Sequence, residues 1–119
     1  MAAKDDLGRR GEDIAAKHLE SQGLVVLSRN WRCSAGELDI VATDGISTVI
    51  FCEVKTRSGV GFGTPIEQVT LGKRRRIRRL SQIWLSTAKT GWHDLRFDVI
   101  GILFDVQGRY QIQHVREAF

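Results

Sequence analysis

The chain has 119 residues, of which 42% are hydrophobic and 27% are charged. That length suits one compact domain, residues 1–119, and is too short for two ordinary domains, while the apolar share excludes a disordered chain. No segment approaches the roughly 20 consecutive apolar residues of a membrane-spanning helix, and residues 1–10 lack the apolar stretch of a signal peptide. We therefore expect a cytoplasmic protein that does not act in a membrane.

The charges are unevenly distributed along the chain. The formal net charge is +4, from 18 Lys and Arg against 14 Asp and Glu, which is a modest excess. From Lys73 to Arg79, however, every residue except Ile77 is cationic. So dense a run can attract a polyanion.

The first predicted element is a helix over Asp5–Gln22, which Gly23 ends. One side of this helix is mostly apolar at the spacing of helical turns. The residues on that side are Leu7, Gly11, Ile14, Ala15, His18 and Leu19. Glu12 lies at the border between this side and the solvent, and His18 is expected to be a core histidine.

Three strands are predicted next, over Leu24–Trp31, Glu37–Thr43 and Ser47–Lys55. Side chains alternate between the two faces of a strand. In the second strand, one face should carry Leu38, Ile40 and Ala42, and the other Glu37, Asp39 and Val41. In the third strand, one face should carry Val49, Phe51, Glu53 and Lys55. Charges on such apolar strands are costly to bury unless they are paired or bind a metal.

The length of the loop between the second and third strands decides whether Asp39 and Glu53 share a face. A two-residue turn at positions 44–45 would pair Thr43 with Ile46 and put the two acids on opposite faces. A three-residue loop would make them diagonal neighbours, about 7–8 Å apart by Cα, and a five-residue loop would set them directly opposite each other. We predict a loop of odd length.

The second half of the chain starts with a predicted loop over Thr56–Gln68, which contains the only proline and is a candidate functional loop. A helix over Thr70–Thr87 follows, and strands over Leu95–Phe104 and Tyr110–Val115 close the chain. The inward side of the helix is predicted to carry Ile77, Leu80, Trp84 and Leu85. The order α-β-β-β-α-β-β argues for an α/β fold, a mixed sheet flanked by helices.

Asp39, Glu53 and Lys55 would form one chemical group if the strands pair as predicted. Two carboxylates on one face repel each other unless a proton or a cation lies between them. Oxygen ligands with open positions suit Mg²⁺ or Mn²⁺, which bind through one or two carboxylates together with water and substrate phosphate. A lysine on the same side could hold the attacking water or stabilise charge on the phosphate. The group therefore indicates phosphodiester hydrolysis.

Three segments carry a resemblance to a known family. They are Gly8-Arg9-Arg10-Gly11-Glu12, Gly36-Glu37-Leu38-Asp39-Ile40-Val41 and Phe51-Cys52-Glu53-Val54-Lys55-Thr56-Arg57. From Gly8 to Val99, the chain closely resembles the YraN-like family of small bacterial predicted endonucleases. That family belongs to the PD-(D/E)XK superfamily, whose fold is that of restriction endonucleases, and it is similar to archaeal Holliday junction resolvases.

The resemblance implies a three-layer, restriction-endonuclease-like core and roles for particular residues. Asp39 and Glu53 would be metal ligands, Lys55 the catalytic lysine, and Glu12 the helix acid that completes the metal site. The implied cofactor is Mg²⁺ or Mn²⁺. The implied substrate is DNA, branched or otherwise structured.

The resemblance also suggests further polar residues around the site. Gln68 and Lys73 stand where related nucleases place another active-site or DNA-contacting residue, and Gln68 is included among the catalytic candidates. Leu38 replaces the proline of the superfamily's motif, at a position that varies widely. The candidate contacts to nucleic acid are Lys73, Arg74, Arg75, Arg76, Arg78, Arg79 and Arg57.

Other interpretations of the sequence stay open. The chain could be a nucleic-acid-binding module that keeps the fold and the acids without turnover, or a protein that docks a partner along its closing strands. The cationic run could be a solvated helix face, and Glu37 could form a salt bridge or take part in metal binding. A resolvase role would require a homodimer, because a junction is cut by two symmetric incisions.

Overall fold

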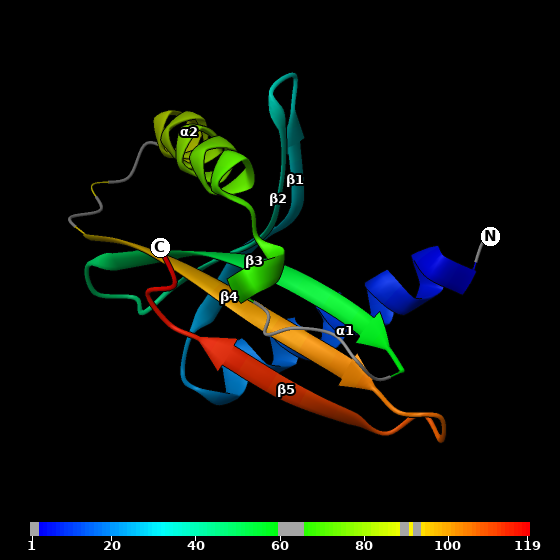
Figure 1. The fold of residues 1–119 in the computed structure, drawn as a ribbon. Coiled ribbons are helices and arrows are strands. Elements are labelled where there is room, and N and C mark those ends of the chain that lie inside the picture. Colours follow the sequence, from blue (N-terminus) through cyan, green and yellow to red (C-terminus); the bar gives the residue numbers. More distant parts are fainter. Residues whose placement is uncertain (1–2, 60–65, 89–90, 92–93) are drawn as a thin grey trace.

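The computed structural model describes residues 3–59, 66–88, 91 and 94–119 (Figure 1). The described residues form two long helices, a short 3₁₀ helix and five strands. In chain order these are α1 (Ala3–Ser21), β1 (Val25–Cys33), β2 (Gly36–Thr43), β3 (Thr48–Ser58), η1 (Ile66–Gln68), α2 (Leu71–Ala88), β4 (Asp94–Phe104) and β5 (Tyr110–Val115). In this part of the chain, neither helix is long and apolar enough to cross a membrane.

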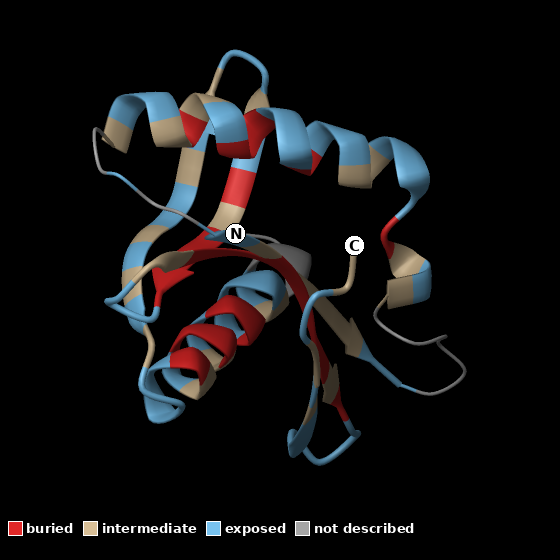
Figure 2. Cartoon of the chain, turned by 90° about the vertical axis from the view of Figure 1, so that its left-hand side faces the viewer, coloured by how far each residue is buried: buried red, intermediate tan, exposed pale blue. Residues whose placement is uncertain are grey.

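The strands form one mixed sheet in the order β1-β2-β3-β4-β5. Neighbours are antiparallel except for β3 and β4, which are parallel and need the crossover that α2 supplies. α1 and α2 lie on opposite sides of the sheet, with their buried residues turned toward it (Figure 2). The predicted α/β fold with a sheet between two helical layers is confirmed, as is the predicted order of elements.

Each face of the sheet has its own hydrophobic cluster. On the α2 side, Leu80 and Trp84 pack against strand residues that include Phe51, so Trp84 is the core residue that the helical spacing predicted. On the α1 side, Leu19 packs among residues that include Ile40. The two clusters together hold the central strands, which carry the candidate acids, between two rigid layers.

α1 crosses β3 at very close range where Gly11 meets Thr56. A Cβ atom built on Gly11 would stand 1.9 Å from Oγ1 of Thr56 and 2.9 Å from its Cβ. Only a residue without a side chain allows this approach. The contact sets the position of the next residue, Glu12, relative to the sheet.

β3 is longer than the alternating pattern predicted. The loop expected over Thr56–Gln68 is wrong at both ends, because residues 56–58 belong to β3 and Ile66–Gln68 forms η1. The reason is the neighbouring strand: β4 pairs with β3 as far as Ser58 and satisfies its backbone hydrogen bonds. Positions 60–65 of the expected loop lie outside the described residues.

The hairpin of β1 and β2 bends out of the sheet toward α2 (Figure 1). The prediction that Leu38 shares a face with Ile40 is wrong, because Leu38 belongs to the cluster on the α2 side. Two irregularities in β1 accompany the bend. They are a bulge between Val26 and Ser28 and a left-handed backbone at Asn30, whose φ is 51°.

A polar cluster that the sequence patterns did not indicate is centred on Asp98 of β4. This fully buried carboxylate accepts hydrogen bonds from Arg96 at 2.9 Å and pairs with His114 Nε2 at 2.7 Å. Burial alone would raise the pKa of Asp98, but the bonds from His114 and Arg96 outweigh it and lower that pKa. His18, expected in the core, is half-buried, and its Nε2 lies 3.1 Å from Nδ1 of His114.

Candidate active site

Asp39 and Glu53 meet because the β2–β3 loop has odd length, as predicted. Thr43 pairs with Val49 and Ile40 pairs with Cys52, so five residues separate the paired ends. Continuing this register sets Asp39 directly opposite Glu53. Asp44 stabilises the loop, since its Oδ1 accepts hydrogen bonds from the backbone N–H groups of residues 46, 47 and 48 at 2.8, 3.0 and 3.1 Å.

The two carboxyl groups lie in an environment that disfavours two negative charges. Oδ2 of Asp39 accepts a hydrogen bond of 2.9 Å from the backbone N–H of Val54, and Glu53 is buried with an exposed fraction of 8%. Burial and the neighbouring Glu53 carboxyl raise the pKa of Asp39 to about 7. At neutral pH, the pair therefore holds a proton part of the time or needs a cation.

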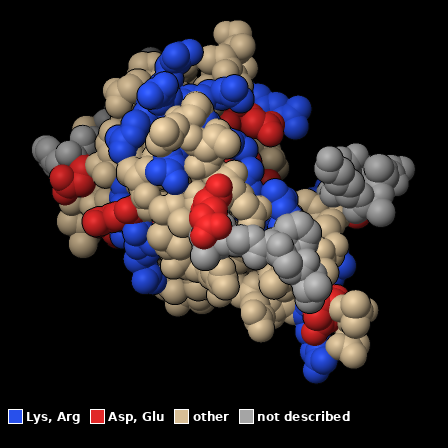
Figure 3. Space-filling view, viewed as in Figure 1, with Lys and Arg blue, Asp and Glu red and all other residues tan. Residues whose placement is uncertain are grey.

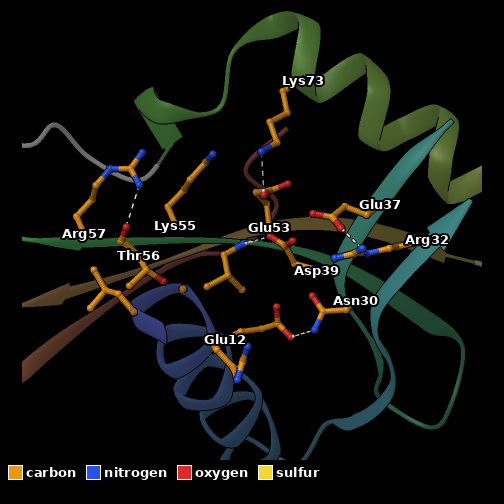
Figure 4. Close-up of a pocket in the computed structure, with 14 residues that line it drawn as sticks. Glu12, Asn30, Arg32, Glu37, Asp39, Glu53, Lys55, Thr56, Arg57 and Lys73 are labelled. Atoms are coloured by element: carbon orange, nitrogen blue, oxygen red, sulfur yellow. Dashed lines mark hydrogen bonds and ion pairs between the residues drawn. The ribbon is translucent and has the colours of Figure 1, made fainter. Parts of the chain in front are cut away.

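Two lysines approach the pair from different elements. Lys73 reaches down from the first turn of α2, with its Nζ 3.2 Å from Oε1 of Glu53, and Lys55 stands two residues after Glu53 on the same strand (Figure 4). Burial lowers the pKa of Lys55, and the neighbouring Lys73 lowers it further. For Lys73, burial acts in the same direction but the attraction of Glu53 prevails, so the pKa is raised.

Glu12 faces the same space from α1. Its Oε1 accepts hydrogen bonds from Nε and an Nη of Arg29, at 3.3 and 3.2 Å, and from Nδ2 of Asn30 at 2.8 Å. Burial raises the pKa of Glu12, Arg29 opposes that shift, and the negative charge of Asp39 adds to it. The influence of Asp39 shows that the two acids are electrostatic neighbours across the site.

These groups line one cleft of about 670 Å³ between α1, α2 and the bent hairpin (Figure 4). Its lining includes the predicted residues Glu12, Asp39, Glu53, Lys55, Arg57 and Lys73. Gln68, at the end of η1, is outside this lining within the described part of the chain. Arg9 and Arg32 also line the cleft, and sequence reasoning did not assign them a role. Glu37 lines it as well and pairs with Arg32 at 3.0 Å, which is the salt-bridge alternative considered for this residue.

The predicted cationic run of α2 divides into two groups. Arg75, Arg76 and Arg79 are exposed, and Lys and Arg side chains gather over α2 and the adjacent hairpin on the face shown in Figure 3. Arg74 is half-buried and donates hydrogen bonds to backbone carbonyls of residues 66 and 69. Arg78 is also exposed, but it lies over the ring of Phe97 at 4.6 Å. The cations are spread around the helix because its period distributes consecutive residues over all sides.

The donor set fits a divalent cation only in part. Among the described residues, no three His, Cys, Asp or Glu side chains are close enough to form a ready-made metal site. Asp39 and Glu53 by themselves suit Mg²⁺ or Mn²⁺, which often use one or two carboxylates and complete their shell with water and phosphate. Glu12 lines the cleft without completing such a group, and its Oε1 accepts the hydrogen bonds from Arg29 and Asn30.

Comparisons with known proteins place the chain in a family. The model for "Uncharacterised protein family UPF0102" matches residues 11–102. The chain belongs to the UPF0102 family. The matched part of this UPF0102 protein includes all the acids of the cleft and Lys55, and the family is the YraN-like one that the three sequence segments predicted.

Relatives within UPF0102 match along almost their whole length. The chain is 49% identical over 119 residues to a UPF0102 protein of Frankia casuarinae, covering 100% of both chains. It is 48% identical over 128 residues to one of Acidothermus cellulolyticus, covering 99% of this chain and 96% of the relative. It is 47% identical over 116 residues to one of Nocardia farcinica, covering 98% and 91% respectively.

Proposed function

We propose that this UPF0102 protein is a metal-dependent endonuclease with the fold of restriction endonucleases. Its substrate would be DNA, branched or otherwise structured. The observation that carries the proposal is the pairing of Asp39 with Glu53 beside Lys55 in a cleft lined by cations. The repulsion between a buried Glu53 and a half-buried Asp39 destabilises the fold, whereas a metal-dependent phosphodiesterase uses such a pair to hold a hard cation.

The residues of the cleft divide into those that would hold a cation and those that would handle the phosphate. Asp39 and Glu53 would bind Mg²⁺ or Mn²⁺, which when bound would act as a Lewis acid toward a phosphoryl oxygen. Lys55 would hold the attacking water in place or offset charge that develops on the phosphate. Lys73, whose Nζ lies 3.2 Å from Oε1 of Glu53, would contact a substrate phosphate if Glu53 held a cation instead.

The nucleic acid would lie along the cationic walls of the cleft. Arg9, Arg32 and Arg57 line it, and the exposed arginines of α2 extend the positive surface beyond it. Such contacts to the phosphate backbone position a nucleic acid without reading its sequence. Cutting both strands of a junction symmetrically would bring two copies of the protein together.

The proposal is tested by cleavage of duplex, nicked, flapped, single-stranded and four-way DNA, with Mg²⁺ and with Mn²⁺. Glu53→Gln and Lys55→Met should each reduce the cleavage rate by at least about a hundredfold. Matched controls on the outer side of α1 are Glu20→Gln and Lys17→Met, which make the same chemical changes at exposed positions and should cleave normally. Absence of metal-stimulated cleavage of every substrate would contradict the proposal.

The second candidate function is a nucleic-acid-binding module without turnover. It is favoured by the absence of a ready-made cluster of three metal ligands among the described residues and by Lys73, whose ammonium already neutralises Glu53. Titration of Mn²⁺ in a calorimeter separates the two functions. An endonuclease should bind Mn²⁺ and lose that binding in Glu53→Gln, whereas a silent module should bind DNA equally well with and without Glu53 and show no specific Mn²⁺ binding.

A further inference from the structure

Asn30, the only asparagine of the chain, lies in β1 next to the candidate acids. The flanking pairs Arg29–Ile40 and Trp31–Leu38 set it opposite Asp39. Its φ of 51° is left-handed, a conformation that is costly for most residues and is tolerated best by glycine, asparagine and aspartate. Strain of this kind persists where the surrounding structure demands it and is concentrated at functional sites.

The left-handed backbone changes where two consecutive side chains point. In a regular strand, Arg29 and Asn30 would lie on opposite faces. Here both donate hydrogen bonds to the same atom, Oε1 of Glu12, with Asn30 Nδ2 at 2.8 Å (Figure 4) and Arg29 at 3.2 and 3.3 Å. Because these donors all use Oε1, Oε2 is the oxygen of Glu12 left to face the cleft.

We propose that Asn30 is a positioning residue, which orients the Glu12 carboxylate so that Oε2 faces the cation held by Asp39 and Glu53. The inference rests on the proposed endonuclease function and adds to it how Glu12 takes part. A carboxylate that rotates freely presents either oxygen, whereas one held by the Asn30 amide presents a fixed one. Partners of this kind, which hydrogen-bond a group at a metal, change metal affinity by about 10–100-fold when they are removed.

Two substitutions separate the effect of the side-chain amide of Asn30 from the effect of its backbone conformation. Asn30→Gly keeps the left-handed conformation and removes the amide, whereas Asn30→Ala removes the amide and strains the backbone. With Mn²⁺ in a calorimeter, Asn30→Gly should bind about tenfold more weakly than wild type, at the lower end of that range because Arg29 still holds Oε1. Asn30→Ala should show the same loss of Mn²⁺ affinity together with a lower melting temperature.

A double-mutant cycle tests whether Asn30 acts through Glu12. In a Glu12→Gln background, Asn30→Gly should cause no further loss of Mn²⁺ affinity, because the group it orients is no longer a carboxylate. In cleavage assays at saturating metal, kcat should fall while the KM for DNA stays close to wild type. A purely structural role would lower thermal stability and leave the Mn²⁺ affinity of the folded protein unchanged.

The outcomes distinguish this inference from the function on which it rests. Normal Mn²⁺ affinity in Asn30→Gly, or an equal loss in the Glu12→Gln background, would overturn the role of Asn30 while the endonuclease proposal stands. A wild-type protein that neither binds Mn²⁺ nor cleaves DNA would overturn both. Mn²⁺ affinity that falls about tenfold only when Glu12 is intact would support both.

Discussion

The contact between Gly11 and Thr56 offers a test of how the fold positions the cleft. In Gly11→Ala, the new Cβ would stand 1.9 Å from Oγ1, 2.8 Å from Cγ2 and 2.9 Å from Cβ of Thr56. Rotation of the threonine side chain can clear the first two atoms but not the third, which is attached to the backbone of β3. α1 must therefore move away by at least about 0.5 Å, the difference between 2.9 Å and the 3.4 Å at which ordinary contact begins.

A matched substitution on the same helix isolates the energy of this overlap. Gly8 is exposed on α1 and a Cβ there would meet nothing within 4 Å, so Gly8→Ala should raise the free energy of unfolding by about 1 kcal/mol through helix propensity. Gly11→Ala gains the same stabilisation from helix propensity, but it overpacks the contact with β3, which costs about 1–3 kcal/mol. The two variants should therefore differ by about 1–3 kcal/mol, with Gly11→Ala the less stable.

Urea unfolding of both variants measures the difference, and titration of Mn²⁺ shows whether the shift reaches the cleft. Because Glu12 follows Gly11 directly, displacement of α1 should weaken Mn²⁺ binding in Gly11→Ala and leave it unchanged in Gly8→Ala. Equal stabilisation by both substitutions would refute the reasoning, since it would mean that α1 does not pack against β3 at the described distance.

Three further predictions concern charge. The pKa of Asp39 is raised to about 7, so the contribution of this residue to stability is lost as the pH rises from 3.8 through 7. Asp39→Asn should therefore stabilise the protein at pH 8, without added metal, by up to about 4 kcal/mol. An unchanged urea midpoint at pH 8 would contradict this. The pKa of Asp98 is lowered, so its effect on stability has the opposite pH dependence. The contribution of Asp98 to stability is present above pH 3.8 and is lost as the pH falls through the folded-state pKa. Acid unfolding of Asp98→Asn should therefore depend less on pH below 4 than that of wild type. Arg79→Gln should reduce the salt dependence of DNA binding by about one phosphate contact. Arg78→Gln loses the ring contacts with Phe97 and Phe119 and should lower the free energy of unfolding by about 0.5–1 kcal/mol. If the two variants showed the opposite effects, the two arginines would have been assigned to the wrong groups.

The cleft joins a carboxyl pair to cations that come from both helices and from the strands between them. Lys73 compensates Glu53, and its ammonium would be available to the substrate if Glu53 held a cation. Asp39 lowers stability at neutral pH, because burial opposes its ionisation and raises its pKa. The proposed function and stability therefore act in opposite directions at Asp39, as they often do at active sites.

Much of the site could be predicted from local patterns. Alternation along β2 and β3 placed Asp39, Glu53 and Lys55 on one side, and the parity of the loop followed from the requirement that the acids meet. The bounds predicted for β5, Tyr110–Val115, are those of the structure, because a short alternating strand between turns leaves few alternatives. These features depend on residues close in sequence, where the period of the backbone sets the direction of each side chain.

The remaining features depend on partners that are distant in sequence. The period of α2 could place Trp84 inward, but it could not show that Lys73 reaches Glu53 or that Arg78 lies over Phe97. Nor could it show that Asn30 adopts a left-handed backbone and binds Glu12. The sequence by itself determined which residues share a face in the regular parts of the strands and helices, because those directions repeat along the chain, but not at Asn30 and Leu38, where the hairpin bends. Only the tertiary structure decided which charges meet, because the bend of the hairpin and the crossing of α1 at Gly11 arise from packing between separate elements.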